Sequence, residues 1–213
     1  MEGELPGRQG RLLCGFLTLN RLRALSRAEV VDALWPDGHD GGLAPLLSKL
    51  RRTVELDGLR VVADWVDVEA ASDALHRAES ALAQGDAHAA WAPSQVAMFI
   101  TGRPFLAGEE APWIDEERRA QSRTRLRALE AYADAALGIG GTELAAAIRV
   151  GRELVSREPY RESGYRILIE GLAREGNGAE AILVYEALRT RLREELGITP
   201  SDRTQEAYRR LLR

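Results

Sequence analysis

The sequence has little cysteine and few aromatic residues, and each shortage removes a class of protein. One cysteine, Cys14, among 213 residues cannot form an internal disulfide, and a lone thiol cannot build a zinc ribbon or an iron–sulfur site. Aromatic residues make up 6%, which disfavours a β-sandwich or a barrel. No apolar run approaches the about 20 residues that span a bilayer, and the acidic start Met1–Glu4 is unlike a secretory signal. We expect a cytoplasmic protein that does not contact a membrane.

Histidine is also scarce, which bears on catalysis. His39, His76 and His88 stand far from one another and from Cys14, in no metal-ligand spacing. The chain contains no HExxH, CxxC or phosphate-loop pattern. We therefore predict no catalytic residues, no metal site and no cofactor, and an enzyme is the least favoured class.

The composition favours helix, and the charge is divided unevenly. Ala, Leu, Arg and Glu dominate the second half of the chain, and all four favour helix. The net charge of −4 divides into +1 over residues 1–60, with nine Lys/Arg and eight Asp/Glu, and −5 over the rest, with twenty and twenty-five. A surface that binds nucleic acid must therefore be a small patch near the N-terminus.

The N-terminal residues predict three helices followed by a short β element. Apolar residues recur at helical spacing from Arg8 to Leu19, and Ser26–Glu29 forms a capping-box pattern that opens a second helix. A third helix is predicted over residues 43–55. Its leucines form one stripe, and the polar residues on or beside the opposite face are Ser48, Lys49, Arg51 and Arg52. Residues 58–68 then favour a short strand or hairpin.

From about Val68 to the end, turn-forming residues delimit about seven helices. Ala147, Gly151 and Leu154 are followed 34 residues later by Ala181, Tyr185 and Leu188, which is the period of a tetratricopeptide repeat. We expect three stacked helix pairs, the last at about 161–195, and a terminal helix at about 202–212. The predicted fold is mostly α, with one domain over 1–66 and a helical repeat domain over 67–213.

Two groups of residues resemble a known family, the Streptomyces antibiotic regulatory proteins. The segments similar to their winged helix-turn-helix are Arg8–Leu13, Ser26–Glu29, Leu34–Pro36 and Leu47–Arg52. The segments similar to the bacterial transcriptional activation domain that follows it are Pro159–Tyr165, Ala181–Tyr185, Glu194–Ser201 and Tyr208–Leu212. The resemblance implies a winged helix, a tetratricopeptide-like domain and a role in activating transcription. Family members place a small β-sheet before the first helix, for which residues 1–7 leave little room, and residues 59–64 supply one strand where a hairpin is expected.

Two hypotheses remain open from the sequence. In the first, the helix at 43–55 enters the major groove of double-stranded DNA through Ser48, Lys49, Arg51 and Arg52, while Arg60 in the wing and Arg27 contact the backbone. The repeat domain then binds RNA polymerase subunits or a second copy of the chain. In the second, the chain is a protein-interaction module whose degenerate N-terminal domain does not bind DNA.

Overall fold

A computed structural model describes residues 5–36, 38 and 42–212, and these fold into two compact units. The first unit combines residues 1–69 with residues 103–121. The second combines residues 70–102 with residues 122–213. Residues Met1–Glu4 and the predicted loop residue His39 lie outside the described part of the chain.

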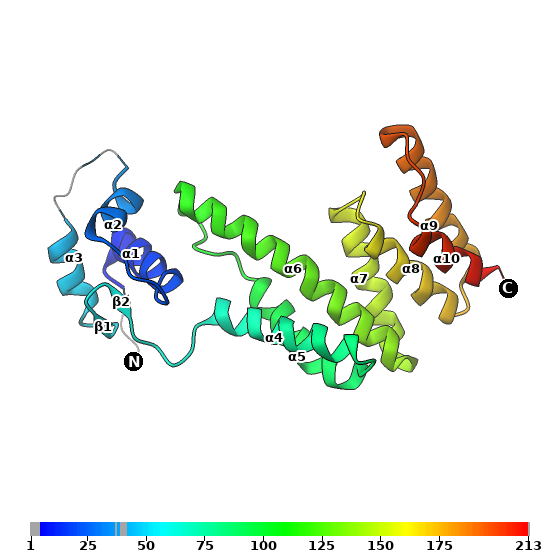
Figure 1. Ribbon diagram of the computed structural model, residues 1–213, viewed down its shortest axis with the longest axis horizontal. Helices are drawn as coiled ribbons and strands as arrows, with labels where there is room; N and C mark the ends of the chain where they lie inside the picture. The colour runs from blue at the N-terminus through cyan, green and yellow to red at the C-terminus, as the bar shows by residue number, and fades with distance from the viewer. Residues whose placement is uncertain (1–4, 37, 39–41, 213) are drawn as a thin grey trace. The chain divides into compact units, whose positions relative to one another are not determined.

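The first unit is a three-helix domain with a β-hairpin (Figure 1). Its elements are α1 (Gly7–Leu19), α2 (Arg27–Leu34), α3 (Leu43–Leu50), β1 (Leu56–Asp57) and β2 (Arg60–Val61). Leu13, Leu17, Val30, Leu43 and Leu50 have no exposed surface, so one apolar core joins all three helices. In the described residues the only sheet is the antiparallel pair β1–β2.

Two boundaries predicted for this unit are wrong. The third helix ends at Leu50 instead of continuing to residue 55, because the N–H groups of Arg52 and Thr53 bond three residues back in tight turns. The single strand predicted at 59–64 is instead a hairpin of two-residue strands, with Leu56 opposite Val61. Gly58 makes the reversal with a φ of +63°, a conformation that glycine adopts without strain.

Residues 103–121 complete the first unit although they follow two helices of the second unit, α4 (Asp67–Ala83) and α5 (Ala87–Thr101), in sequence. Ile114 is fully buried in the core, and the Trp113 ring meets Phe16 edge-to-face with centroids 5.3 Å apart. The Trp113 Nε1–H donates to the carbonyl of Ala33 on α2 at 3.1 Å. This segment therefore braces α1 and α2 from outside the three-helix sequence.

The second unit is built from helix pairs. Its helices are α4 (Asp67–Ala83), α5 (Ala87–Thr101), the second half of α6 (Pro112–Ile139), α7 (Leu144–Arg157), α8 (Glu162–Arg174), α9 (Gly178–Arg191) and α10 (Asp202–Leu211). A 3-10 turn (Gly141–Glu143) precedes α7, and a π turn (Leu192–Leu196) follows α9. The prediction of about seven helices in this part of the chain is confirmed.

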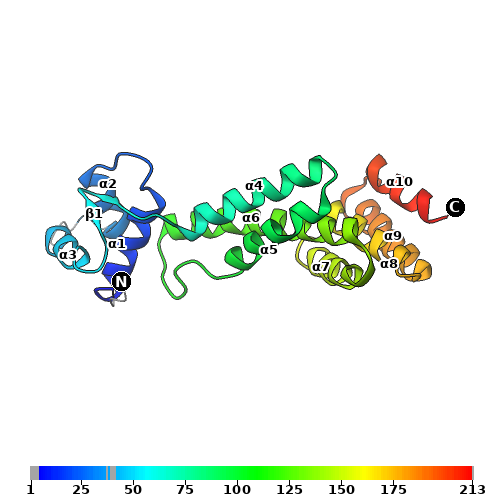
Figure 2. The same cartoon turned by 90° about the horizontal axis from the view of Figure 1, so that it is seen from below.

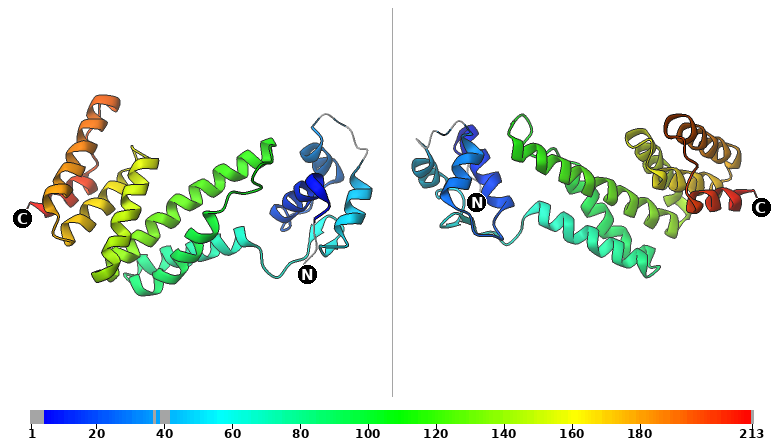
Figure 3. Two further views of the ribbon diagram at one scale, coloured as in Figure 1. Left: turned by 180° about the vertical axis from the view of Figure 1, so that it is seen from behind. Right: turned by 45° about the horizontal axis from the view of Figure 1, so that its top comes forward.

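Small residues let these helices pack closely. Alanines from α4, α5 and α6 form a shared core, and these helices lie side by side (Figure 2). Further along, α7, α8 and α9 follow one another and α10 packs on the last pair (Figure 3), where Tyr185 stacks on Tyr208 at 3.9 Å. The predicted mostly α fold, a winged helix-turn-helix followed by a tetratricopeptide-like domain, is confirmed.

Candidate nucleic-acid interface

The start of α2 is fixed by the predicted capping box. The Ser26 hydroxyl accepts from the backbone N–H of Glu29 at 3.2 Å, and the Glu29 carboxylate accepts from the Ser26 N–H at 2.8 Å. That backbone hydrogen bond, helped by Arg23, lowers the pKa of Glu29 to about 2. Arg27 stands in the first turn of this anchored helix with an exposed side chain.

Helix α3 presents a polar face opposite a buried one. Leu43, Leu47 and Leu50 are at most 6% exposed and anchor the helix on the domain. Ser48 and Lys49 lie on its exposed side. An eight-residue helix is about 12 Å long, enough to place one or two turns in a major groove.

Arg51 and Arg52 belong to the turns after α3, not to the helix itself. Arg51 Nη2 donates to the carbonyl of Gly58 at 3.4 Å, which links the end of α3 to the tip of the hairpin. Arg52 is exposed, and within the described residues neither its side chain nor that of Lys49 forms a hydrogen bond or an ion pair. These two cations are therefore available to phosphate oxygens without breaking an internal contact.

The predicted residues thus fall on neighbouring segments. Ser48, Lys49, Arg51 and Arg52 lie within five positions of one another at the end of α3. Arg60 begins β2 and sits 3.6 Å from Asp57 in an exposed ion pair, which contributes little stability. Arg27 is the first residue of α2.

Sequence reasoning missed a second group of cations beside the hairpin. A groove of about 510 Å³ runs between the α1–α2 connection and the hairpin, lined by Arg21, Leu22, Arg23, Ala24, Leu25, Asp57, Leu59 and Arg60. Arg21 is already held by Glu69, with Nε 2.7 Å from Oε1, and by the Ala63 carbonyl. Arg23 is held by Glu29 at 2.6 Å. Arg21 thus ties the α1–α2 connection to residues that follow the hairpin, and its partner Glu69, 48 positions away, could not be read from local sequence.

The described residues contain neither a metal-binding cluster nor a membrane-spanning helix. Within residues 5–36, 38 and 42–212, no three His, Cys, Asp or Glu side chains are placed to hold a metal ion. Burial raises the pKa of the Cys14 thiol, which opposes formation of a reactive thiolate. In the same residues no helix has the length and apolar content needed to cross a membrane.

A winged helix-turn-helix joined to a helical repeat domain defines a class of transcription regulators. The family model described as "Bacterial transcriptional activator domain" matches residues 66–212, and the chain belongs to that family. The resemblance to the Streptomyces antibiotic regulatory proteins is confirmed by its relatives. Two of those relatives are named as regulatory proteins and one as a transcriptional regulator.

Three curated relatives align with nearly the whole of this chain. It is 30% identical to "Regulatory protein AfsR" of Streptomyces griseus and 30% identical to AfsR of Streptomyces coelicolor, in each case over 96% of this chain and 22% of the relative. It is 29% identical to "Transcriptional regulator RedD" of Streptomyces coelicolor, over 93% of this chain and 62% of RedD. The chain therefore spans about a fifth of AfsR and under two thirds of RedD.

A solved structure supports the fold. Mycobacterium tuberculosis EmbR, in complex with a low-affinity phosphopeptide, superposes with a TM-score of 0.74 over 96% of this chain and 58% of EmbR. The sequence identity is 21%, so this likeness concerns the fold alone. The chain thus shares the fold of EmbR and belongs to the bacterial transcriptional activator domain family.

Proposed function

We propose that this chain regulates transcription, as an activator, by binding double-stranded DNA through the end of α3. In this proposal Ser48 and Lys49 on α3, with Arg51 and Arg52 just beyond it, contact the major groove and its flanking phosphates. Arg60 on the hairpin and Arg27 at the start of α2 contact the backbone, where a helix N-terminus also favours phosphate.

One observation carries the proposal. Lys49 and Arg52 are exposed at the end of a helix whose leucines are buried, and their side chains have no hydrogen bond or ion pair among the described residues. Several arginines of the second unit are instead tied to carboxylates, as Arg127 is to Glu79 at 2.6 Å, although Arg203 and Arg210 are not. A cation left unpaired on an anchored helix is what phosphate contacts require.

The two domains predicted from the sequence have different roles in this proposal. We propose that residues 1–66 bind DNA, that residues 103–121 brace them, and that residues 67–213 make the protein contacts of the activator. The expected partners of the helical domain are RNA polymerase subunits and a second copy of the chain, because an activator must contact the transcription machinery or another protomer.

A second candidate function is an interaction module that does not bind DNA. The shortness of the hairpin favours it, because two-residue strands leave few backbone positions to follow the minor groove. The net charge of −5 over residues 61–213 favours it as well. In this reading the first unit only supports the helical domain.

Selection of sheared genomic DNA by the full chain, followed by sequencing, separates the two functions. We would run it at about 50 and about 200 mM salt, since phosphate contacts weaken with salt. The test variant is K49A/R51A/R52A. The matched control, R77A/R193A/R209A, also removes three exposed cations but on the helical domain. Enrichment of discrete sites by the wild type and the control only is expected, and no enrichment by any of them would favour the interaction module.

A further inference from the structure

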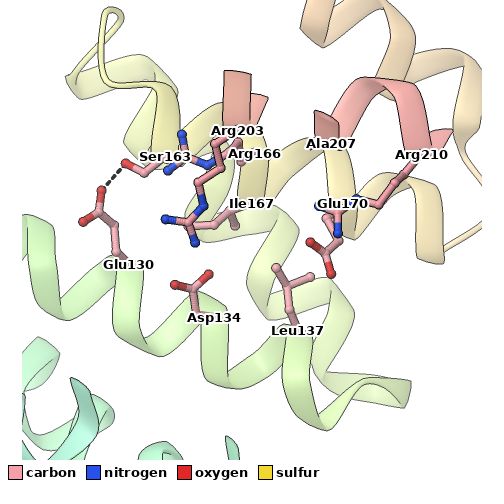
Figure 4. Close-up of a pocket in the computed structure, with 10 residues that line it drawn as sticks. All are labelled: Glu130, Asp134, Leu137, Ser163, Arg166, Ile167, Glu170, Arg203, Ala207 and Arg210. Carbon is pink, nitrogen blue, oxygen red and sulfur yellow. Dashed lines mark hydrogen bonds between the residues drawn. The ribbon is translucent and has the colours of Figure 1, made fainter. Parts of the chain in front are cut away.

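A charged recess lies within the second unit, between α6, α8 and α10. Its volume is about 240 Å³. Figure 4 shows side chains from the three helices around it. Its charged lining residues are Glu130 and Asp134 from α6, Arg166 and Glu170 from α8, and Arg203 and Arg210 from α10. Three guanidinium groups thus face three carboxylates. The net charge of the recess depends on which of these six groups are paired with residues around it.

Two of the carboxylates already have partners. Glu130 accepts from Arg161 Nε at 2.6 Å and from Arg161 Nη2 at 2.8 Å, and the Ser163 hydroxyl donates to it as well. Glu170 lies 3.8 Å from Arg174 on the same helix. These ion pairs neutralise two of the three negative charges in the recess.

Asp134 is the remaining carboxylate, and among the described residues it has no hydrogen bond and no ion pair. Burial, with a contribution from the charge of Glu130, raises its pKa to about 6. The positive charges of Arg203 and Arg166 oppose this shift.

The three arginines have almost no internal partners. Arg166 is half-buried and donates a hydrogen bond of 3.2 Å to the hydroxyl of Thr204. Burial and the nearby charge of Arg203 lower its pKa. Arg203 and Arg210 have no hydrogen bond or ion pair within the described part of the chain. Against Asp134, and against Glu162, whose charge also acts on Arg166, the recess holds a surplus of about one positive charge.

We propose that this recess binds a small phosphate dianion, either inorganic phosphate or a small phosphate monoester. Guanidinium groups form paired, charge-assisted hydrogen bonds with phosphate oxygens, and three of them converge here from two helices. The surplus positive charge attracts an anion. The small volume between three helices suits a small solute. None of the lining residues is among those proposed to contact DNA.

The test is calorimetric titration of the full chain with inorganic phosphate and, separately, with glycerol phosphate, at an ionic strength held constant with chloride. Saturable binding is expected, and the two titrations show which phosphate source the recess accepts. In R203A/R210A the affinity should fall by at least about tenfold, because each charge-assisted hydrogen bond contributes about that much. The control R193A/R209A removes two exposed arginines that do not line the recess and should bind as the wild type does.

The substitution Asp134→Asn should change the affinity for phosphate in the opposite direction. It removes the one unpaired negative charge from the recess, so both ligands should bind more tightly to this variant than to the wild type. Failure of the wild type to bind either ligand would overturn the proposal. So would equal loss of affinity in R203A/R210A and R193A/R209A, or weaker binding by D134N, while thermal unfolding of each variant confirms that it is folded.

Discussion

Arg11 Nη2 lies 2.6 Å from Glu109 Oε1, although the two residues are 98 positions apart. Arg8 Nε lies 2.7 Å from the other carboxylate oxygen. Glu109 is 4% exposed, so its charge depends on these two arginines of α1. The first unit is therefore closed by a segment that arrives from the far end of α5.

Replacing Glu109 with Gln should destabilise the first unit by removing the charge that both arginines share. The control is Glu110→Gln, since Glu110 is exposed. The hydrogen bond from Arg11 and the two nearby positive charges lower the pKa of Glu109 below its ordinary 4.5. The stability it contributes is therefore fully present above about pH 4.5 and is lost as the pH falls through its lowered pKa.

Thermal unfolding across pH measures this effect. At pH 7 the melting temperature of E109Q should be several degrees below that of E110Q, and the gap should narrow below pH 4.5. A gap that is absent at pH 7, or that does not narrow in acid, would show that Glu109 is not held by this ion pair.

The hairpin depends on the backbone of Gly58. Its φ of +63° strains any side chain with a Cβ, although no atom lies within 4 Å of the position that a Cβ would take. Gly58→Ala should therefore lower the free energy of unfolding by about 1 kcal/mol, through backbone strain alone. Gly58→Asn should lose less, because asparagine tolerates this conformation. Chemical denaturation of the two variants checks the order, and equal losses would point to packing instead.

The close contact of α7 with α8 depends on Gly164. A Cβ there would lie 2.8 Å from the Cβ of Leu154, which is fully buried and cannot move aside. Gly164→Ala should destabilise the second unit by about 1–3 kcal/mol. The control is Gly178→Ala, where the nearest atom would be at 3.8 Å. Urea denaturation of both variants measures the difference, and a neutral G164A would mean that the two helices can separate freely.

Asp134 should reduce stability near neutral pH. Its pKa is raised from 3.8 to about 6 in the folded protein, chiefly by burial, so the folded state holds the proton more tightly than the unfolded state. The penalty is absent below about pH 4, grows between pH 4 and 6, and is fully present above it. Asp134→Asn should therefore raise the melting temperature at pH 7 and leave it nearly unchanged at pH 4. A rise of the same size at both values would show that charge is not the cause.

The sequence predicted those features that depend on neighbouring residues. The capping box at Ser26 and the buried leucines of α3 were readable because helical spacing and caps are local. The end of α3 was not, because Val54 and Leu56 pack into the core by way of the hairpin, and that packing decides where the helix stops.

Long-range contacts could not be predicted in the same way. The attachment of Glu109 to α1 and the recess formed by Asp134, Arg166 and Arg203 join residues that are far apart in the chain. Each of these residues is of a type that is common on helix surfaces and in loops. Only the packing of the helices shows that they meet.

The most direct test of the proposed function is the salt dependence of the affinity of the full chain for a DNA site obtained by the selection. The logarithm of the binding constant should fall linearly with the logarithm of salt concentration, and the slope should shrink by about 0.9 for each phosphate contact removed. We predict a lower affinity and a shallower slope for K49A/R51A/R52A, and an unchanged affinity and slope for R77A/R193A/R209A. Identical affinities and slopes for the wild type and K49A/R51A/R52A would contradict DNA binding through the end of α3.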